Sequence, residues 1–152
     1  MAKIGDFFDD SAKEASIESQ LKIGVVLKLR VILSSGTKEK RIIVIGFNSD
    51  RSQLAFVTIN SDVNRPYLRN RPILRALQVE LKISGRDYLT YDSYVNCAEI
   101  YPRDYTATVN DIKNDFKIII GNASDSDLSI IRTTLQGAGT ISDYVKQTFS
   151  LL

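Results

Sequence analysis

Arginine side chains are concentrated in residues 64–75, which read NRPYLRNRPILR and include no acidic residue. Prolines at positions 66 and 72 exclude a regular helix or a central strand, so we expect an exposed, stiffened loop. Guanidinium groups bind phosphate oxygens, and an aromatic ring among them can stack on a base. We name this segment the arginine arm and predict a nucleic-acid contact through Arg65, Tyr67, Arg69, Arg71 and Arg75. The alternative is a solvated loop whose arginines pair with surface carboxylates.

A second group of side chains suited to chemistry lies at the ends of predicted strands: Arg41, Thr58, Asn60, Ser61, Asp92 and Ser93. Of these, we predict Arg41, Thr58, Ser61 and Asp92 as catalytic candidates. In phosphoryl chemistry, arginine stabilises the charge that develops on phosphate, while a positioned carboxylate or hydroxyl handles the proton. If the strands are neighbours in a closed sheet, these residues share one rim. The alternative is structural, because Thr58 favours strands and Ser61 and Asp92 favour turns.

The chain has no histidine and one cysteine, Cys97. A zinc site of the usual kind and acid–base catalysis by imidazole are therefore excluded, and we predict neither a metal ion nor another cofactor. The sequence also has no glycine-rich phosphate loop and no nucleophile-elbow motif. Cys97 lies in an apolar stretch without a neighbouring cation, so we expect a buried, inert thiol.

The formal net charge of +2 conceals a strong asymmetry along the chain. Residues 1–20 carry a net charge of −3, residues 21–86 carry +9, and residues 87–152 carry −4. A central excess of positive charge steers polyanions towards one part of a surface. No apolar run is long enough to span a membrane, and the N-terminus has no signal-peptide core, so we expect a cytoplasmic protein without membrane contact.

Apolar residues alternate with polar ones in the middle of the chain, which predicts a sheet. Five strands are predicted at residues 21–33, 42–47, 53–59, 76–84 and 94–101, and Pro102 is expected to close the last. Short turns and one long loop favour a small barrel or a strongly coiled antiparallel sheet. Residues 117–120 fit either another strand or a helix end.

Helical patterns flank this sheet region. Residues 3–19 predict an amphipathic helix, which packs as ordinary core or binds a partner. Towards the C-terminus, Ser124 is suited to cap a helix through about residue 136, and Thr140 is suited to cap another. A length of 152 residues with 43% apolar residues predicts a single α+β domain, with a helical segment at 1–20, a β core at 21–103 and a mainly helical part at 104–152.

Four short stretches occur in the order found in the PemK/MazF-like toxins of bacterial toxin–antitoxin systems. These are IGVV at 23–26, KRIIV at 40–44, FVTINS at 56–61 and DSYV at 92–95. The resemblance covers residues 21–103 and implies a five- to six-stranded antiparallel SH3-like barrel with an N-terminal helix and C-terminal helices. The chain departs from the family at Val25, where the family has an acidic residue, and at Ile42, where it has proline.

The resemblance implies a metal-independent endoribonuclease, a hydrolase that cleaves single-stranded RNA. By position, Arg41 then contributes to cleavage and Ser61 or Thr58 assists, while Asp92 is our own addition from its place before the fifth strand. An acidic antitoxin protein and a second copy of the chain, in a homodimer, are further candidate partners. The alternative function is a non-catalytic module that binds nucleic acid or protein on the same barrel.

Overall fold

A computed structural model describes residues 4–61 and 68–152. The elements follow in the order α1 (Ile4–Gln20), β1 (Val25–Leu33), β2 (Gly36–Phe47), β3 (Gln53–Asn60), α2 (Pro72–Ala76), β4 (Gln78–Leu81), β5 (Ser93–Asp104), α3 (Tyr105–Asn114), the 3₁₀ helix η2 (Phe116–Ile118), β6 (Ile119–Asn122), α4 (Asp125–Gly137) and α5 (Asp143–Thr148).

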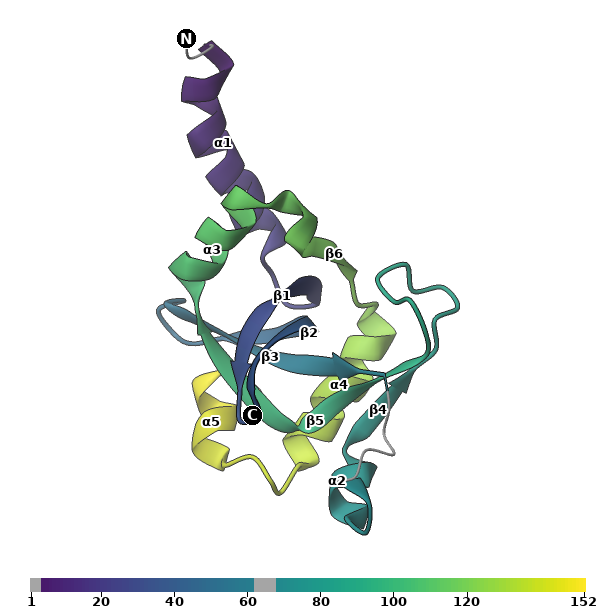
Figure 1. Cartoon of the computed structure of the whole chain (residues 1–152). Coiled ribbons are helices and arrows are strands. Elements are labelled where there is room, and N and C mark those ends of the chain that lie inside the picture. The colour runs from purple at the N-terminus through teal and green to yellow at the C-terminus, as the bar shows by residue number, and fades with distance from the viewer. Residues whose placement is uncertain (1–3, 62–67) are drawn as a thin grey trace.

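The six strands form one antiparallel sheet in the order β4-β5-β3-β2-β1-β6. The sheet curls into a half-barrel, with β4 and β6 as its two edges (Figure 1). An N-terminal helix and C-terminal helices accompany it, which confirms the predicted α+β class. Residues 117–120 contain both predicted alternatives, because η2 leads directly into β6.

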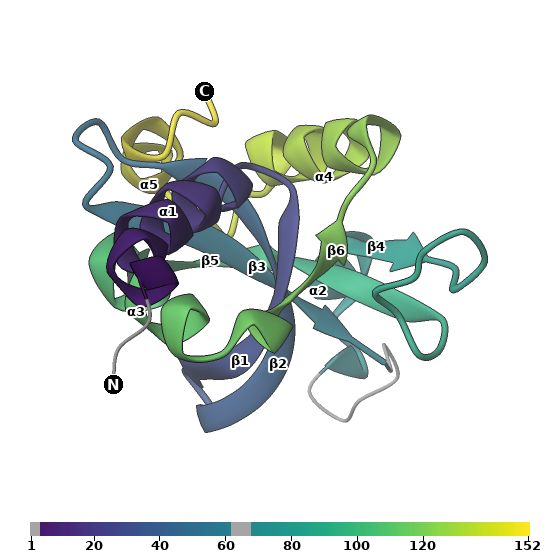
Figure 2. The same ribbon diagram turned by 90° about the horizontal axis from the view of Figure 1, so that it is seen from above.

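Apolar side chains fill both faces of the sheet. On one face, Ile43 packs in a core that includes Ile131 and Leu135 of α4. On the other face, Ile42 packs in a second core that includes Ile17 of α1 and Ile112 of α3. Successive strand residues point to opposite faces, so neighbours in β2 belong to different cores. Figures 1 and 2 show α1 and α3 on one side of the sheet and α4 and α5 on the other.

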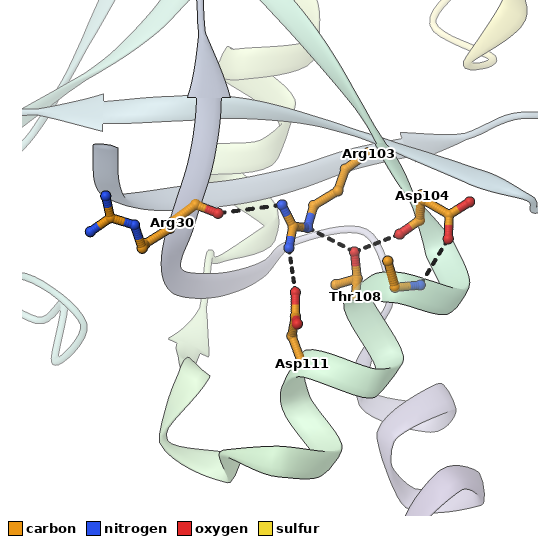
Figure 3. A network of polar contacts seen from close by, with 6 residues as sticks. Arg30, Arg103, Asp104, Thr108 and Asp111 are labelled. Carbon is orange, nitrogen blue, oxygen red and sulfur yellow. Dashed lines mark hydrogen bonds and ion pairs between the residues drawn. The ribbon is translucent and has the colours of Figure 1, made fainter. Parts of the chain in front are cut away.

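A polar network joins α3 to the end of β5 (Figure 3). Asp104 is the N-cap of α3, because its carboxylate accepts a hydrogen bond from the backbone N–H of Ala107 at 2.8 Å. Arg103 donates from Nε to the hydroxyl of Thr108 at 3.0 Å and pairs with Asp111 of the same helix. This network fixes the turn from strand to helix, at a position where we predicted no particular helix.

The fifth strand does not end before Pro102, as predicted, but continues to Asp104. Pro102 stands opposite Ala55 in the ladder with β3. The other edge of β5 pairs with β4 only from Ser93 to Asn96, so no strand of the described chain lies beside Pro102 there. A proline without an N–H is tolerated at such an open edge.

Two further local predictions were wrong. The arginine arm does contain a short helix, α2, because Pro72 stands at its start, where a missing N–H costs no hydrogen bond. The N-cap of α5 is Ser142 and not Thr140. The hydroxyl of Thr140 donates instead to the carbonyl of Ala98 at 2.6 Å. No helix in the described ranges is long and apolar enough to cross a membrane.

Candidate nucleic-acid interface

A pocket of about 460 Å³ opens on the sheet face that α1 and α3 partly cover. Among the residues that the structure describes, three cationic side chains and one carboxylate line it, together with amides, hydroxyls and an aromatic ring. Its residues are Leu33, Ser34, Ser35, Lys38, Lys40, Thr58, Asn60, Arg71, Asn96, Glu99 and Tyr101. The volume lies within the range of small-molecule sites in proteins. The excess of cations makes it suited to an anionic ligand.

The alternation of β2 explains how the cations reach the pocket. Lys38 and Lys40 share a face with Ile42, because strand residues two apart point the same way. Ile42 is fully buried in the second core, whereas the two lysines lie further along the strand. The same change occurs on β3, where Phe56 is in the core and Thr58 lines the pocket. The pocket is therefore the continuation of a core face beyond the helices that cover it.

An irregularity in β5 shapes the other wall. Thr58 of β3 stands opposite Asn96, but Phe56, two residues earlier, stands opposite Tyr101. The extra residues of β5 interrupt the ladder at this point, as in a β-bulge. Glu99 lies within the interruption and, with Tyr101, lines the pocket. The hydroxyl of Tyr101 donates to the carboxylate of Glu99.

Hydrogen bonds hold the polar side chains at the base of the pocket. The ammonium of Lys40 donates to Oδ1 of Asn60 at 2.7 Å, and Nδ2 of Asn60 donates to Oγ1 of Thr58 at 3.3 Å. Asn96 accepts from Nε2 of Gln78 at 2.9 Å. Asn96 and Thr58 are 9% and 4% exposed, so both side chains lie at the bottom of the pocket. We name Thr58, Asn60 and Asn96 the pocket floor.

The structure does not bring the four predicted catalytic residues together. Thr58 is in the pocket floor. Arg41 shares its face of β2 with Ile43, on the opposite side of the sheet, and its Nε donates to the carbonyl of Tyr88 at 3.0 Å. Ser61 follows β3 and is exposed, outside the pocket lining. Asp92 accepts from the backbone N–H of Ile83 at 2.8 Å, a contact that joins the two ends of the loop between β4 and β5.

The predicted arginine arm contributes one residue to the pocket. Arg71 lines the pocket, and Arg69 and Arg75 are exposed without lining it. Arg65 and Tyr67 lie outside the described residues. Arg71 of the arginine arm therefore lines the same pocket as Lys38 and Lys40 of β2.

Several pocket residues were missed from the sequence: Lys38, Lys40, Asn96, Glu99 and Tyr101. A signal was present on β2. In the alternation of this strand, Lys38 and Lys40 point to the same face as Ile42 and Val44, which belong to the second core. Polar residues on the strand face that otherwise points into a core indicate that the core does not extend to that part of the strand. On β5 no comparable signal existed, since the interruption that places Glu99 depends on the pairing of the strands.

The single cysteine has no part in this site. Cys97 is fully buried in the first core, and burial raises the pKa of its thiol to about 12. In residues 4–61 and 68–152, no three or more Cys, Asp and Glu side chains gather in a way that could hold a metal ion.

Comparisons with known proteins give likenesses to solved structures and no match to a family model or a curated protein. Twenty chains of solved structures are similar to it. One belongs to the crystal structure of MazE-MazF (Form-III) from Deinococcus radiodurans, with a TM-score of 0.49 and 13% sequence identity. The match covers 76% of this chain and 92% of that chain. A likeness of this degree assigns neither a family nor an activity to the chain.

Proposed function

We propose that the chain binds single-stranded RNA in the pocket between β2, β3 and β5. The observation that carries the proposal is the gathering of Lys38, Lys40 and Arg71 around a floor of neutral amide and hydroxyl side chains. Cations neutralise phosphates and supply the largest part of affinity for nucleic acid. Among the described residues that line the pocket, Glu99 is the only carboxylate, and it accepts a hydrogen bond from Tyr101.

A single strand fits this geometry better than a duplex. The floor lies at the bottom of a pocket of about 460 Å³, which offers room for an unstacked base or a phosphate. Sequence-specific recognition of RNA usually takes this form, with splayed bases that meet side chains at their edges. Tyr101, half-buried in the wall, offers an aromatic ring beside the floor.

Metal-independent cleavage of the bound strand is a second candidate function, favoured by the presence of Glu99 among the cations. In this reaction Glu99 takes the proton of a 2′-hydroxyl, whose oxygen attacks the adjacent phosphorus. The bond from phosphorus to the 5′ oxygen breaks, and the departing oxygen takes a proton from the ammonium of Lys40. Positive charge around the phosphate stabilises the pentacoordinate state. Lys40 then takes the part that the family resemblance gave to Arg41.

The salt dependence of binding tests the first proposal. Affinity for an unstructured RNA oligomer should fall with salt, and Lys38→Gln, Lys40→Gln and Arg71→Gln should each reduce the slope of log affinity against log salt by about 0.7. Lys117→Gln is the matched control, because Lys117 is exposed in η2 and lies outside the pocket lining. If the control reduces the slope as much as the pocket variants, the site lies elsewhere.

Incubation of a long single-stranded RNA with EDTA tests cleavage. Cleavage by the wild type that is lost in Lys40→Gln and Glu99→Gln, with circular dichroism unchanged, supports the enzyme. Cleavage lost in Arg41→Ala but kept in both pocket variants would place the reaction on the opposite face of the sheet. Binding without cleavage would leave a non-catalytic module, with an acidic protein as a further ligand for the same cations.

A further inference from the structure

The helix that follows Arg71 is held beside the pocket with little packing. Arg71 is the N-cap residue of α2, and none of the five residues that the structure describes in α2 is buried. Ile73 of this helix is 71% exposed, whereas Leu68, just before Arg71, is 2% exposed. Apolar burial is the main favourable term in folding, so α2 gains little stability from its own side chains. Polar contacts therefore have to hold α2 in place.

The side chain of Gln78 makes two contacts of this kind. Its Nε2 donates to the carbonyl of Leu74, in α2, at 3.1 Å and to Oδ1 of Asn96, in the pocket floor, at 2.9 Å. A carbonyl can only accept, so the nitrogen and not the oxygen of the Gln78 amide must face Leu74. The backbone N–H of Ala98 donates to Oδ1 of Asn96 at 3.1 Å, which fixes the Asn96 amide in the matching orientation. Gln78 thus uses one hydrogen on the arginine arm and the other on the pocket floor.

Strand pairing fixes Gln78 relative to the pocket floor. Gln78 of β4 stands directly opposite Asn96 of β5, so the two side chains lie on the same face of the sheet. The carbonyl of Leu77 also binds β5, because it accepts from the backbone N–H of Cys97 at 2.8 Å. The carbonyl of Leu74 accepts from the backbone N–H of Leu77 at 3.2 Å as well as from Gln78. The last turn of α2 is therefore joined to the pair of strands that supplies Asn96.

The position of Arg71 depends on the position of α2, because the carbonyl of Arg71 accepts from the backbone N–H of Arg75 at 3.1 Å. Gln78 itself is not among the described residues that line the pocket. Resting on RNA binding as the function, we propose that Gln78 is a positioning residue that holds α2 so that the guanidinium of Arg71 stays over the pocket floor. A cation held in place before the ligand arrives loses less entropy on binding. Lys38 and Lys40 come from β2 and do not depend on this contact.

Amide hydrogen exchange, measured by NMR on the protein without RNA, tests the hold on α2. Gln78→Met keeps the length of the side chain and removes both hydrogen-bond donors. The N–H groups of Arg75 and Leu77, whose bonds close the turns of α2, should exchange about fivefold faster in this variant, the effect of one lost hydrogen bond. Gln53→Met is the matched control, because Gln53 is exposed in β3 and lies outside the pocket lining, and it should leave both rates unchanged. Equal rates in wild type and Gln78→Met would overturn the inference.

The salt dependence of binding to an unstructured RNA oligomer tests the effect on Arg71. Arg71→Gln should reduce the slope of log affinity against log salt by about 0.7 in the wild-type background and by about zero in the Gln78→Met background, whereas Lys38→Gln should reduce it by about 0.7 in both. Equal effects of Arg71→Gln in the two backgrounds would overturn the positioning role and leave RNA binding in place. Loss of the Lys38→Gln effect in the Gln78→Met background would also overturn it, because the whole pocket would then depend on Gln78. A wild type that binds no RNA would refute the proposed function, and this inference with it.

Discussion

Replacement of Asp127 by alanine should lower the free energy of unfolding by about 3 kcal/mol. Nε and Nη2 of Arg86 each donate to one oxygen of the Asp127 carboxylate, both at 2.8 Å. The side chains of Arg86 and Asp127 are only 25% and 8% exposed. Removal of the Asp127 carboxylate leaves the guanidinium charge of Arg86 without its counter-ion in a largely buried position. We take the lower end of the usual cost, because Arg86 keeps its bond to the carbonyl of Lys82.

Urea denaturation followed by circular dichroism measures this cost, since the chain has no tryptophan. A loss of about 3 kcal/mol corresponds to a fall of about 6 to 12 °C in Tm for a chain of this size. Asp125→Ala is the matched control, because Asp125 is exposed in the same first turn of α4. Its loss should stay below about 1 kcal/mol, the contribution of a charge near a helix N-terminus. Equal losses in the two variants would refute the reasoning.

The same pair predicts a dependence on pH. The hydrogen bond from Arg86 is the main cause that holds the pKa of Asp127 below its ordinary value. A carboxyl with a lowered pKa in the folded state stabilises the fold above its unfolded pKa, near 3.9, and loses that effect as pH falls through the folded value. The difference in stability between wild type and Asp127→Ala should therefore be constant from about pH 5 to 7 and shrink below about pH 4. A difference that already shrinks at neutral pH would contradict this assignment.

Two further predictions concern the first core. Gly46→Ala should destabilise the fold by about 1–3 kcal/mol in urea denaturation, because its Cβ would lie 2.5 Å from the backbone oxygen of Phe149, whereas Gly139→Ala, which has open space, should not. Cys97 should react slowly with a thiol reagent under native conditions and rapidly in denaturant, since burial raises its pKa to about 12, and rapid native labelling would show that the strand opens.

The sheet could be predicted from the sequence because alternation is a local signal. Val26, Ile43 and Val57 lie within stretches whose apolar pattern predicted strands, and all three are fully buried. The predicted strand at 76–84 was too long, because β4 ends at Leu81 and Ile83 is 42% exposed. An alternating pattern shows which residues share a face, but the partner strand decides where pairing stops.

The site could be predicted only in part. The excess of central positive charge was evident from the sequence, and Thr58 and Arg71, which line the pocket, were named as candidates from their residue types. The sequence did not predict that Arg41 and Thr58 lie on opposite faces of the sheet, because a shift of one residue along β2 moves a side chain from one face to the other. Asn96 carries no signal by itself, since the hydrogen bonds that it accepts from Ala98 and Gln78 form only in the folded sheet.

The most direct test of the RNA-binding proposal is the salt dependence of binding for a variant with all three pocket cations replaced. Lys38→Gln, Lys40→Gln and Arg71→Gln combined should reduce the slope of log affinity against log salt by about 2 relative to wild type, with an unchanged circular dichroism spectrum. A folded triple variant that binds single-stranded RNA with the wild-type affinity and slope would contradict the assignment of this pocket as an RNA site.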